Sequence, residues 1–293
     1  MRCHHEFSIF AWLSGLIGVV IFSGSLPATR IAVMDFNPWF LTGIRAVIAG
    51  IVAMVLLKIL KAKRPSKRDY GNLVYVAVGV VVGFPLFTAL ALQHISAAFS
   101  IVFIGLLPLC TAIFAVLRSN ERPQLTFWLF SLFGSGLVVL YILLDISLNT
   151  QSFFGILYML CAIILCGFGY AEGANLAKKI GGWQVICWAL VISLPVMLIV
   201  TIYNYSSEIQ DKLTLSGLVA VLYISIFSML IGFFFWYYGL SKGGIASVGQ
   251  LQLLQPFMGL ALAAVILHEP ISANMLIITA GVICCVASAK KFA

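Results

Sequence analysis

The sequence has 293 residues, of which 62% are hydrophobic and only 9% are charged, and its formal net charge is +8. A water-soluble domain is roughly 45–50% apolar and about 25% charged, so this composition excludes a soluble enzyme and indicates a surface that faces lipid. The basic residues lie at the ends of apolar segments, where such residues orient membrane proteins. We therefore expect membrane lipid, and not nucleic acid, as a partner.

Ten segments are long enough to cross a membrane, since a helix needs about 20 mainly apolar residues to span roughly 30 Å of hydrocarbon. The predicted spans are 7–28, 37–59, 70–92, 97–117, 124–144, 153–177, 183–203, 213–240, 245–267 and 271–289. The first is not interpreted as a signal peptide, because it lacks an A-x-A-like cleavage site and continues into the second. The sequence predicts an all-α polytopic membrane protein with ten transmembrane helices.

Lys and Arg residues are distributed unevenly between the two sides of this arrangement. With the N-terminus inside, one side holds Arg2, Lys58, Lys61, Lys63, Arg64, Lys67, Arg68, Arg118, Arg122, Lys178, Lys179, Lys242, Lys290 and Lys291. The other side holds only Arg30 and Lys212. Cytoplasmic loops carry the excess of basic residues, so we expect both termini in the cytoplasm, with a bacterial inner membrane as the favoured location.

The seven cysteines form no C-x-x-C pair and no cluster with histidine, and all but Cys3 lie within apolar runs. A free cysteine there behaves as a small hydrophobic residue. The sequence therefore predicts no disulfide framework, no metal site and no cofactor.

The two halves of the chain match each other when one is shifted by 148 residues. Pro108 then falls on Pro256, and Glu121 falls on Glu269. The predicted repeats are 1–148 and 149–293, each with five spans. Because five is odd, the second repeat enters the membrane inverted relative to the first, an arrangement typical of secondary transporters that work by alternating access. An old duplication without a mechanistic role is the alternative.

Short polar and proline-containing motifs occur in a fixed order along the chain. They are Phe22–Thr29; Asn37-Pro38 with Arg45 seven residues on; Ala91–Ala98 with Pro108 and Glu121; and Gly239–Ala246 with Pro256 and Glu269-Pro270. In this order and spacing they resemble the drug/metabolite transporter superfamily, specifically the EamA-type ten-helix transporters. The chain departs from the family at Phe22, where a tryptophan is frequent.

The resemblance implies a cavity lined by helices 1–4 and 6–9, with helices 5 and 10 peripheral and involved in a homodimer. It also implies export or exchange of small metabolites. The family's substrates are too diverse for the resemblance to identify one here.

Glu172 is an acid well inside the sixth predicted helix, where a charge costs at least about 2.5–3.5 kcal/mol. Tyr170 and Asn175 lie close to it in the sequence, and glycines leave room around it. We expect this carboxylate to bind an amine or a transported proton. The alternative is an acid that reaches the inner face or pairs with a lysine, since Lys178 is only six residues away.

Further polar and aromatic residues are candidates for the cavity wall. Arg45 would bind a substrate carboxylate or hold helices together, and no direct salt bridge with Glu172 is expected. Gln252 and Gln255 share one helix face and would line the cavity or bond between helices, which contributes about 0.6 kcal/mol on average. The remaining candidates are Ser25, Trp12, Trp236 and Tyr237, the last two as a cation–π wall.

The sequence therefore predicts a secondary transporter for small, amine-bearing metabolites: amino acids, polyamines or organic cations. A proton or another cation is the expected coupling partner. A lipid or nucleotide-sugar translocator of the same architecture is a second hypothesis, although it would favour a more basic cavity. A membrane-embedded enzyme is a third, but the chain has no H-E-x-x-H or G-x-S-x-G pattern and no second intramembrane acid.

Overall fold

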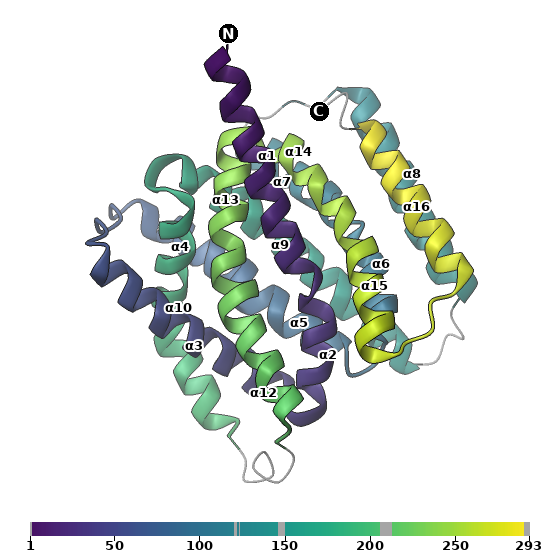
Figure 1. Ribbon diagram of the computed structural model, residues 1–293, viewed down its shortest axis with the longest axis horizontal. Coiled ribbons are helices and arrows are strands. Elements are labelled where there is room, and N and C mark those ends of the chain that lie inside the picture. Colours follow the sequence, from purple (N-terminus) through teal and green to yellow (C-terminus); the bar gives the residue numbers. More distant parts are fainter. Residues whose placement is uncertain (1, 120–121, 123, 146–149, 206–212, 290–293) are drawn as a thin grey trace.

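The computed structural model describes residues 2–119, 122, 124–145, 150–205 and 213–289, and this part of the chain is helical without strands (Figure 1). The predicted all-α class is confirmed. The elements are α1 (Arg2–Ser23), α2 (Ser25–Asp35), α3 (Pro38–Ile59), α4 (Asp69–Val76), the π-helical η1 (Ala77–Gly83), α5 (Phe84–Ala91), α6 (Ala97–Ile104), α7 (Leu107–Ser119), α8 (Leu125–Asp145), α9 (Thr150–Ile180), α10 (Gly182–Tyr203), α12 (Leu215–Leu222), the π-helical η2 (Tyr223–Ile231), α13 (Gly232–Gly243), α14 (Ile245–Gly249), the 3-10 helical η3 (Gln250–Leu254), α15 (Gln255–Leu267) and α16 (Ala273–Ala289).

Eight helical segments of the described chain are long and apolar enough to cross a membrane. They are Ile9–Asp35, Pro38–Ile59, Asp69–Ala91, Ala97–Arg118, Phe153–Ile180, Gly182–Tyr203, Leu215–Gly243 and Ile245–Leu267. The other two predicted spans correspond to α8 and α16, whose described apolar runs, Leu125–Gly134 and Ala273–Cys285, are shorter. The count of ten spans therefore stays a prediction.

The first span differs most from its predicted bounds, because it ends at Asp35 instead of near residue 28. The predicted end lies within the motif Phe22–Thr29, but the chain continues there as α2, with Pro27 in its first turn. Proline is tolerated there because the backbone N–H that it lacks would have no partner in the helix anyway.

Irregular segments occur at matching places in the two halves of the chain. The π segment η1, shifted by 148 residues, falls within η2. Pro108 lies just after the break between α6 and α7, and Pro256 lies just after η3. Proline lacks the N–H that a continuous helix needs, which explains both breaks. A duplicated architecture predicts this correspondence; the inverted relation of the halves stays a prediction.

The long helices pack mainly in pairs. α3 packs along α10, α1 packs along α13, and α9 packs against α4, η1, α5 and α7. Small residues permit these close approaches: a Cβ at Gly239 of α13 would lie 2.9 Å from the backbone nitrogen of Gly15 in α1. α8 and α16 pack on each other at one edge of the bundle, where the resemblance places the peripheral helices (Figure 1).

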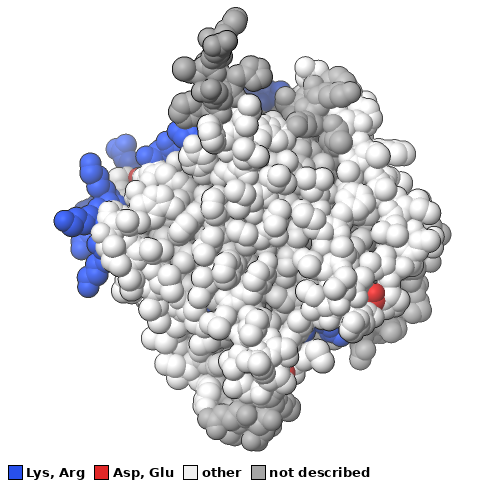
Figure 2. All heavy atoms as spheres, viewed as in Figure 1, with Lys and Arg blue, Asp and Glu red and all other residues white. Residues whose placement is uncertain are grey.

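The distribution of charge agrees with a surface that faces lipid. Figure 2 shows one broad face that is almost free of charged residues, with Lys and Arg gathered at an edge near the α3–α4 connection. Carboxylates near the helix ends serve as caps: the two carboxylate oxygens of Glu269 accept hydrogen bonds from the backbone nitrogens of Ala97 (3.0 Å) and Ala98 (2.7 Å) at the start of α6. Its repeat counterpart Glu121 lies outside the described residues.

Candidate functional site

A small cavity lies inside the bundle, and its lining residues come from α1, α2, α3, η1, α5, α7, α9, η2, α13 and α15. Its volume is about 20 Å³, room for about one water molecule. The lining residues are Phe22, Ser25, Arg45, Val80, Phe84, Pro85, Leu107, Tyr170, Ser228, Met229, Phe233 and Gln255. Four predicted site residues are therefore brought together here: Ser25, Arg45, Tyr170 and Gln255.

Arg45 is the charged residue of this cavity. It is only 4% exposed, and its Nη2 donates a hydrogen bond to the Ile224 carbonyl oxygen at 3.2 Å. Its Nε has no partner among the described residues, and neither ion pair of the described chain involves it. A buried guanidinium without a carboxylate partner is costly in a membrane interior, and it is suited to receive an anionic group.

Two glutamine side chains in and beside the cavity also have polar atoms without a hydrogen-bond partner in the described chain. The Gln255 amide nitrogen donates to the Phe22 carbonyl oxygen at 3.4 Å, while its Oε1 has no partner within the described chain. Gln252 is fully buried, and neither of its amide atoms is bonded there. Each buried unsatisfied polar group costs about 1–3 kcal/mol, so such a concentration points to a functional region.

Two hydroxyl groups close one side of the same cavity. Ser25 Oγ and Ser228 Oγ form a 2.6 Å hydrogen bond that joins α2 to η2. Because this bond connects two lining residues on different spans, separating α2 from η2 to open the cavity would break it.

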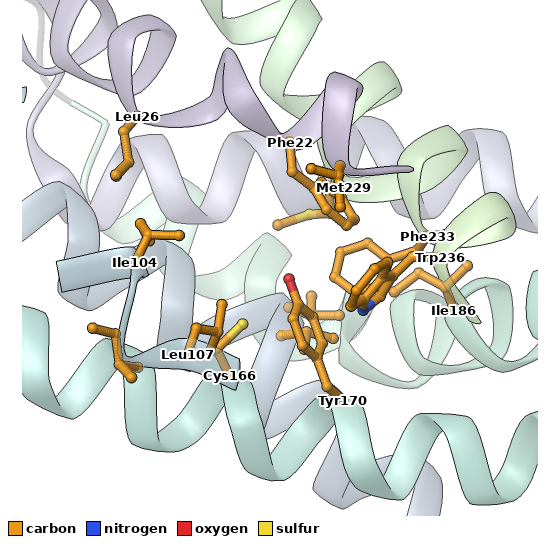
Figure 3. Packing of buried hydrophobic residues seen from close by; sticks show 14 of the residues in the cluster. Phe22, Leu26, Ile104, Leu107, Cys166, Tyr170, Ile186, Met229, Phe233 and Trp236 are labelled. Carbon is orange, nitrogen blue, oxygen red and sulfur yellow. The ribbon is translucent and has the colours of Figure 1, made fainter. Parts of the chain in front are cut away.

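An aromatic cluster forms another part of the wall (Figure 3). The ring centroids of Phe22 and Phe233 are 5.1 Å apart, and those of Tyr170 and Trp236 are 5.5 Å apart. Trp236 is fully buried behind the lining residues, and its indole N–H has no partner in the described part of the chain. It supports the wall instead of forming its surface.

Tyr237, also predicted for the wall, instead links α13 to α9. Its hydroxyl donates to the Gly169 carbonyl oxygen at 3.1 Å. Its ring packs so closely on Gly173 that a Cβ at that position would overlap the ring. Trp12 is half-buried and packs against the main hydrophobic cluster without lining the cavity.

Glu172 lies in a different cluster from the cavity residues. Its carboxylate accepts a hydrogen bond from Arg118 Nε, at the end of α7, in an ion pair. Asn175 donates to the Arg118 carbonyl oxygen at 3.2 Å. Glu172 follows Tyr170 by two residues, or about 200° around the helix, so it faces α7 while Tyr170 faces the cavity. The partner is an arginine of another helix, not the lysine that the sequence suggested as an alternative.

Eight lining residues were not among the predicted site residues: Phe22, Val80, Phe84, Pro85, Leu107, Ser228, Met229 and Phe233. The 148-residue shift would have found two of them, because it carries Tyr170 onto Phe22 and Gln255 onto Leu107. It also relates Val80 to Ser228 and Pro85 to Phe233. Eight of the twelve lining residues thus form four repeat-related pairs.

Comparisons with known proteins identify the family. The EamA-like transporter family matches residues 9–143 and again 153–289. The chain is 56% identical over 282 residues to the uncharacterized transporter YdeK of Bacillus subtilis, covering 96% of this chain and 97% of that protein.

More distant relatives agree. The uncharacterized transporter sll0355 of Synechocystis is 25% identical over 267 residues, covering 85% of this chain and 80% of that protein. A solved crystal structure shares the fold, with a TM-score of 0.74 and 18% identity, over 97% of this chain and 99% of that one. The resemblance seen in the motifs is confirmed: the chain belongs to the EamA-like transporter family and is a multi-pass membrane transporter.

Proposed function

We propose that this protein is a secondary transporter that moves a small amine-bearing metabolite across the bacterial inner membrane by alternating access, as an exporter or exchanger. In this proposal both termini are cytoplasmic, and 1–148 and 149–293 are inverted five-helix repeats. The relatives named above come from bacteria, which supports the location. The excess of Lys and Arg on one side supports the orientation.

The observation that carries this proposal is the central cavity with its four repeat-related pairs of lining residues. A binding site at the interface of two similar halves is the arrangement by which inverted-repeat transporters expose one site to alternate sides. At about 20 Å³ the cavity is too small for a metabolite. Binding therefore requires the spans around it to separate, which is the movement that transport needs.

The polar groups of the cavity wall favour one kind of substrate within the predicted class of amine-bearing metabolites. Arg45 offers a positive charge without a carboxylate partner, while Gln252 and Gln255 offer unpaired amide atoms. Of amino acids, polyamines and organic cations, only amino acids always carry a carboxylate for Arg45. We therefore propose an amino acid or a close derivative as the substrate, with its carboxylate on Arg45.

Glu172 keeps a role in this proposal as a group that becomes available when the bundle opens. In the closed arrangement Arg118 occupies its carboxylate. Separation of α7 from α9 would free the carboxylate to bind the substrate amine or a coupling proton. An exposed arginine, 43% accessible at its side chain, loses little when it is released into water.

The alternative functions have weaker support from the same wall. A nucleotide-sugar or lipid translocator would need a more basic cavity than the single arginine among the described lining residues. A membrane-embedded enzyme would need a pair of acids or a nucleophile with its base at one depth, and the described lining includes no acid and no histidine.

The test is a thermal-shift screen of the purified protein against amino acids, polyamines, organic cations and nucleosides, followed by flux in proteoliposomes. An amino acid should raise the unfolding temperature, since a ligand of the folded state stabilises it. Arg45→Gln should lower the affinity for that amino acid by about tenfold or more, and Arg45→Lys should restore part of it. Stabilisation by polyamines alone, or normal binding in Arg45→Gln, would contradict the amino-acid proposal.

A further inference from the structure

A large groove lies on the side of the bundle, separate from the central cavity. Its volume is about 930 Å³, and it opens between the α1–α13 pair and the end of α3, beside the α9–α10 turn. Its walls include Phe10, Leu13 and Ile17 of α1, Leu60 after α3, and Phe234 and Tyr238 of α13. Because α1 packs closely on α13 and α3 packs closely on α10, the groove remains between two tight pairs.

The walls of this groove are apolar and open to the surroundings. Phe10 is 65% exposed and Leu13 is 50% exposed. Phe10 and Ile17 are seven residues apart on one face of α1, so the groove runs about 10 Å along that helix. In a multi-pass membrane protein such a surface faces hydrocarbon, and its length suits part of an acyl chain.

The end of the groove near the helix termini is basic. Lys178, near the end of α9, and Lys242, in the last turn of α13, are exposed lining residues. Neither forms an ion pair within the described chain. Gly181 and the first residue of α10, Gly182, also line this end, so the N-terminal amides of α10 add positive character.

A second groove, at the other end of α1–α2, lacks the basic residues of the first among its described lining residues. Its volume is about 570 Å³, and its walls include Gly24, Ile31, Val219, Tyr223 and Ile266. Among the residues that the structure describes, no charged side chain lines it. Apolar walls are thus common to both lateral grooves, whereas paired lysines distinguish the larger one.

From this combination we propose that the larger groove binds an anionic phospholipid, with an acyl chain against Phe10, Leu13 and Ile17 and the phosphate between Lys178 and Lys242. Basic pockets between membrane helices bind anionic headgroups by the same attraction. The lipid is a laterally bound ligand and not the transported substrate, so the inference does not depend on the proposed function.

The experiment compares lipid binding by native mass spectrometry of the full-length protein, using phosphatidylglycerol and phosphatidylcholine with identical acyl chains. Lys178→Gln/Lys242→Gln should weaken the binding of phosphatidylglycerol by roughly fivefold for each lysine removed. Phosphatidylcholine should be unaffected by the same change. The matched control is Lys63→Gln/Lys67→Gln, which removes two exposed lysines from the α3–α4 connection and should leave both lipids unchanged.

A second variant tests the acyl-chain half of the site. Leu13→Trp places a bulky side chain in the groove and should weaken the binding of both lipids. Equal losses in the Lys178/Lys242 variant and in the control variant would mean that only overall surface charge matters, and would overturn the proposal. So would unchanged phosphatidylglycerol binding in either groove variant.

Discussion

The two halves of the chain contribute different chemistry to one cavity. At three of the four repeat-related pairs the second half supplies the more polar residue: Tyr170 against Phe22, Ser228 against Val80, and Gln255 against Leu107. The first half supplies the charge through Arg45, whose repeat counterpart, position 193, does not line the cavity.

This difference shows that a duplicated backbone can keep the positions of the lining residues while their side chains change. The two halves place lining residues at matching positions, but a substrate with two unlike ends needs two unlike walls. An anionic group would face Arg45 of the first half, and hydrogen-bonding groups would face the second half. In the proposed function this asymmetry would orient the substrate in the cavity.

The largest expected effect comes from removing the asymmetry. The triple variant Tyr170→Phe/Ser228→Val/Gln255→Leu gives the second half the side chains of the first. Flux in proteoliposomes should fall by roughly 100-fold or more, since each lost hydrogen bond costs about 0.5–1.5 kcal/mol. The unfolding temperature should fall modestly, because Ser228→Val removes the hydrogen bond to Ser25 and Gln255→Leu removes the one to the Phe22 carbonyl oxygen. Loss of Gln255 Oε1, which has no partner in the described chain, offsets part of this cost. Leu198→Met, at an exposed position of α10 outside the cavity, is the control and should leave flux unchanged. Unchanged flux in the triple variant would exclude the assigned site.

A smaller effect is expected at Glu172, whose repeat counterpart is Gly24. Glu172→Gln keeps the size and hydrogen-bonding capacity but removes the charge, so the protein should remain folded in the membrane. Binding of the amine-bearing substrate should weaken by about tenfold, and Glu172→Asp should be less harmful. Affinity and flux of the reconstituted variants are the measurements. If Glu172→Gln behaves like the unmodified protein, the residue serves only to pair with Arg118.

Gly173 is the repeat counterpart of Ser25, and the space that a side chain would need there is filled by Tyr237. Gly173→Ala should therefore destabilise the protein by about 1–3 kcal/mol, as overpacking of a core does. The unfolding temperature in detergent measures this loss. Gly136→Ala is the matched control, because a Cβ at that position of α8 has no neighbour within 4 Å. Equal unfolding temperatures for the two variants would contradict the close contact.

The smallest effect on activity is expected from labelling experiments that test how the halves are oriented. In a cysteine-free background, a cysteine at Lys63 should react only from the cytoplasm, and one at Leu213 only from outside. Both residues are exposed and lie at opposite ends of spans, so flux should be unchanged. Labelling of the Lys63 site from outside would reverse the orientation that the basic residues predict.

The sequence predicted most helix ends closely. The spans predicted at 37–59 and 97–117 are Pro38–Ile59 and Ala97–Arg118 in the structure, because apolar runs end where proline or charged residues begin. The rotation of a helix is harder to predict when it is apolar on all sides. Glu172 was expected beside Tyr170, yet it faces Arg118, 54 residues away in the chain. No local signal identifies such a partner.

Three cavity residues lie within the π segments themselves, Val80 in η1 and Ser228 and Met229 in η2. A π turn amounts to an α-helix with one extra residue, inserted at a single point. The residues on either side of it are therefore out of phase with each other. Deleting one residue from η2 would restore a regular α-helix and rotate α13, with Phe233 and Trp236, by about 100° about its axis. A change of one residue in the length of η2 would thus turn Phe233 and Trp236 away from Phe22 and Tyr170, although it would substitute none of these side chains.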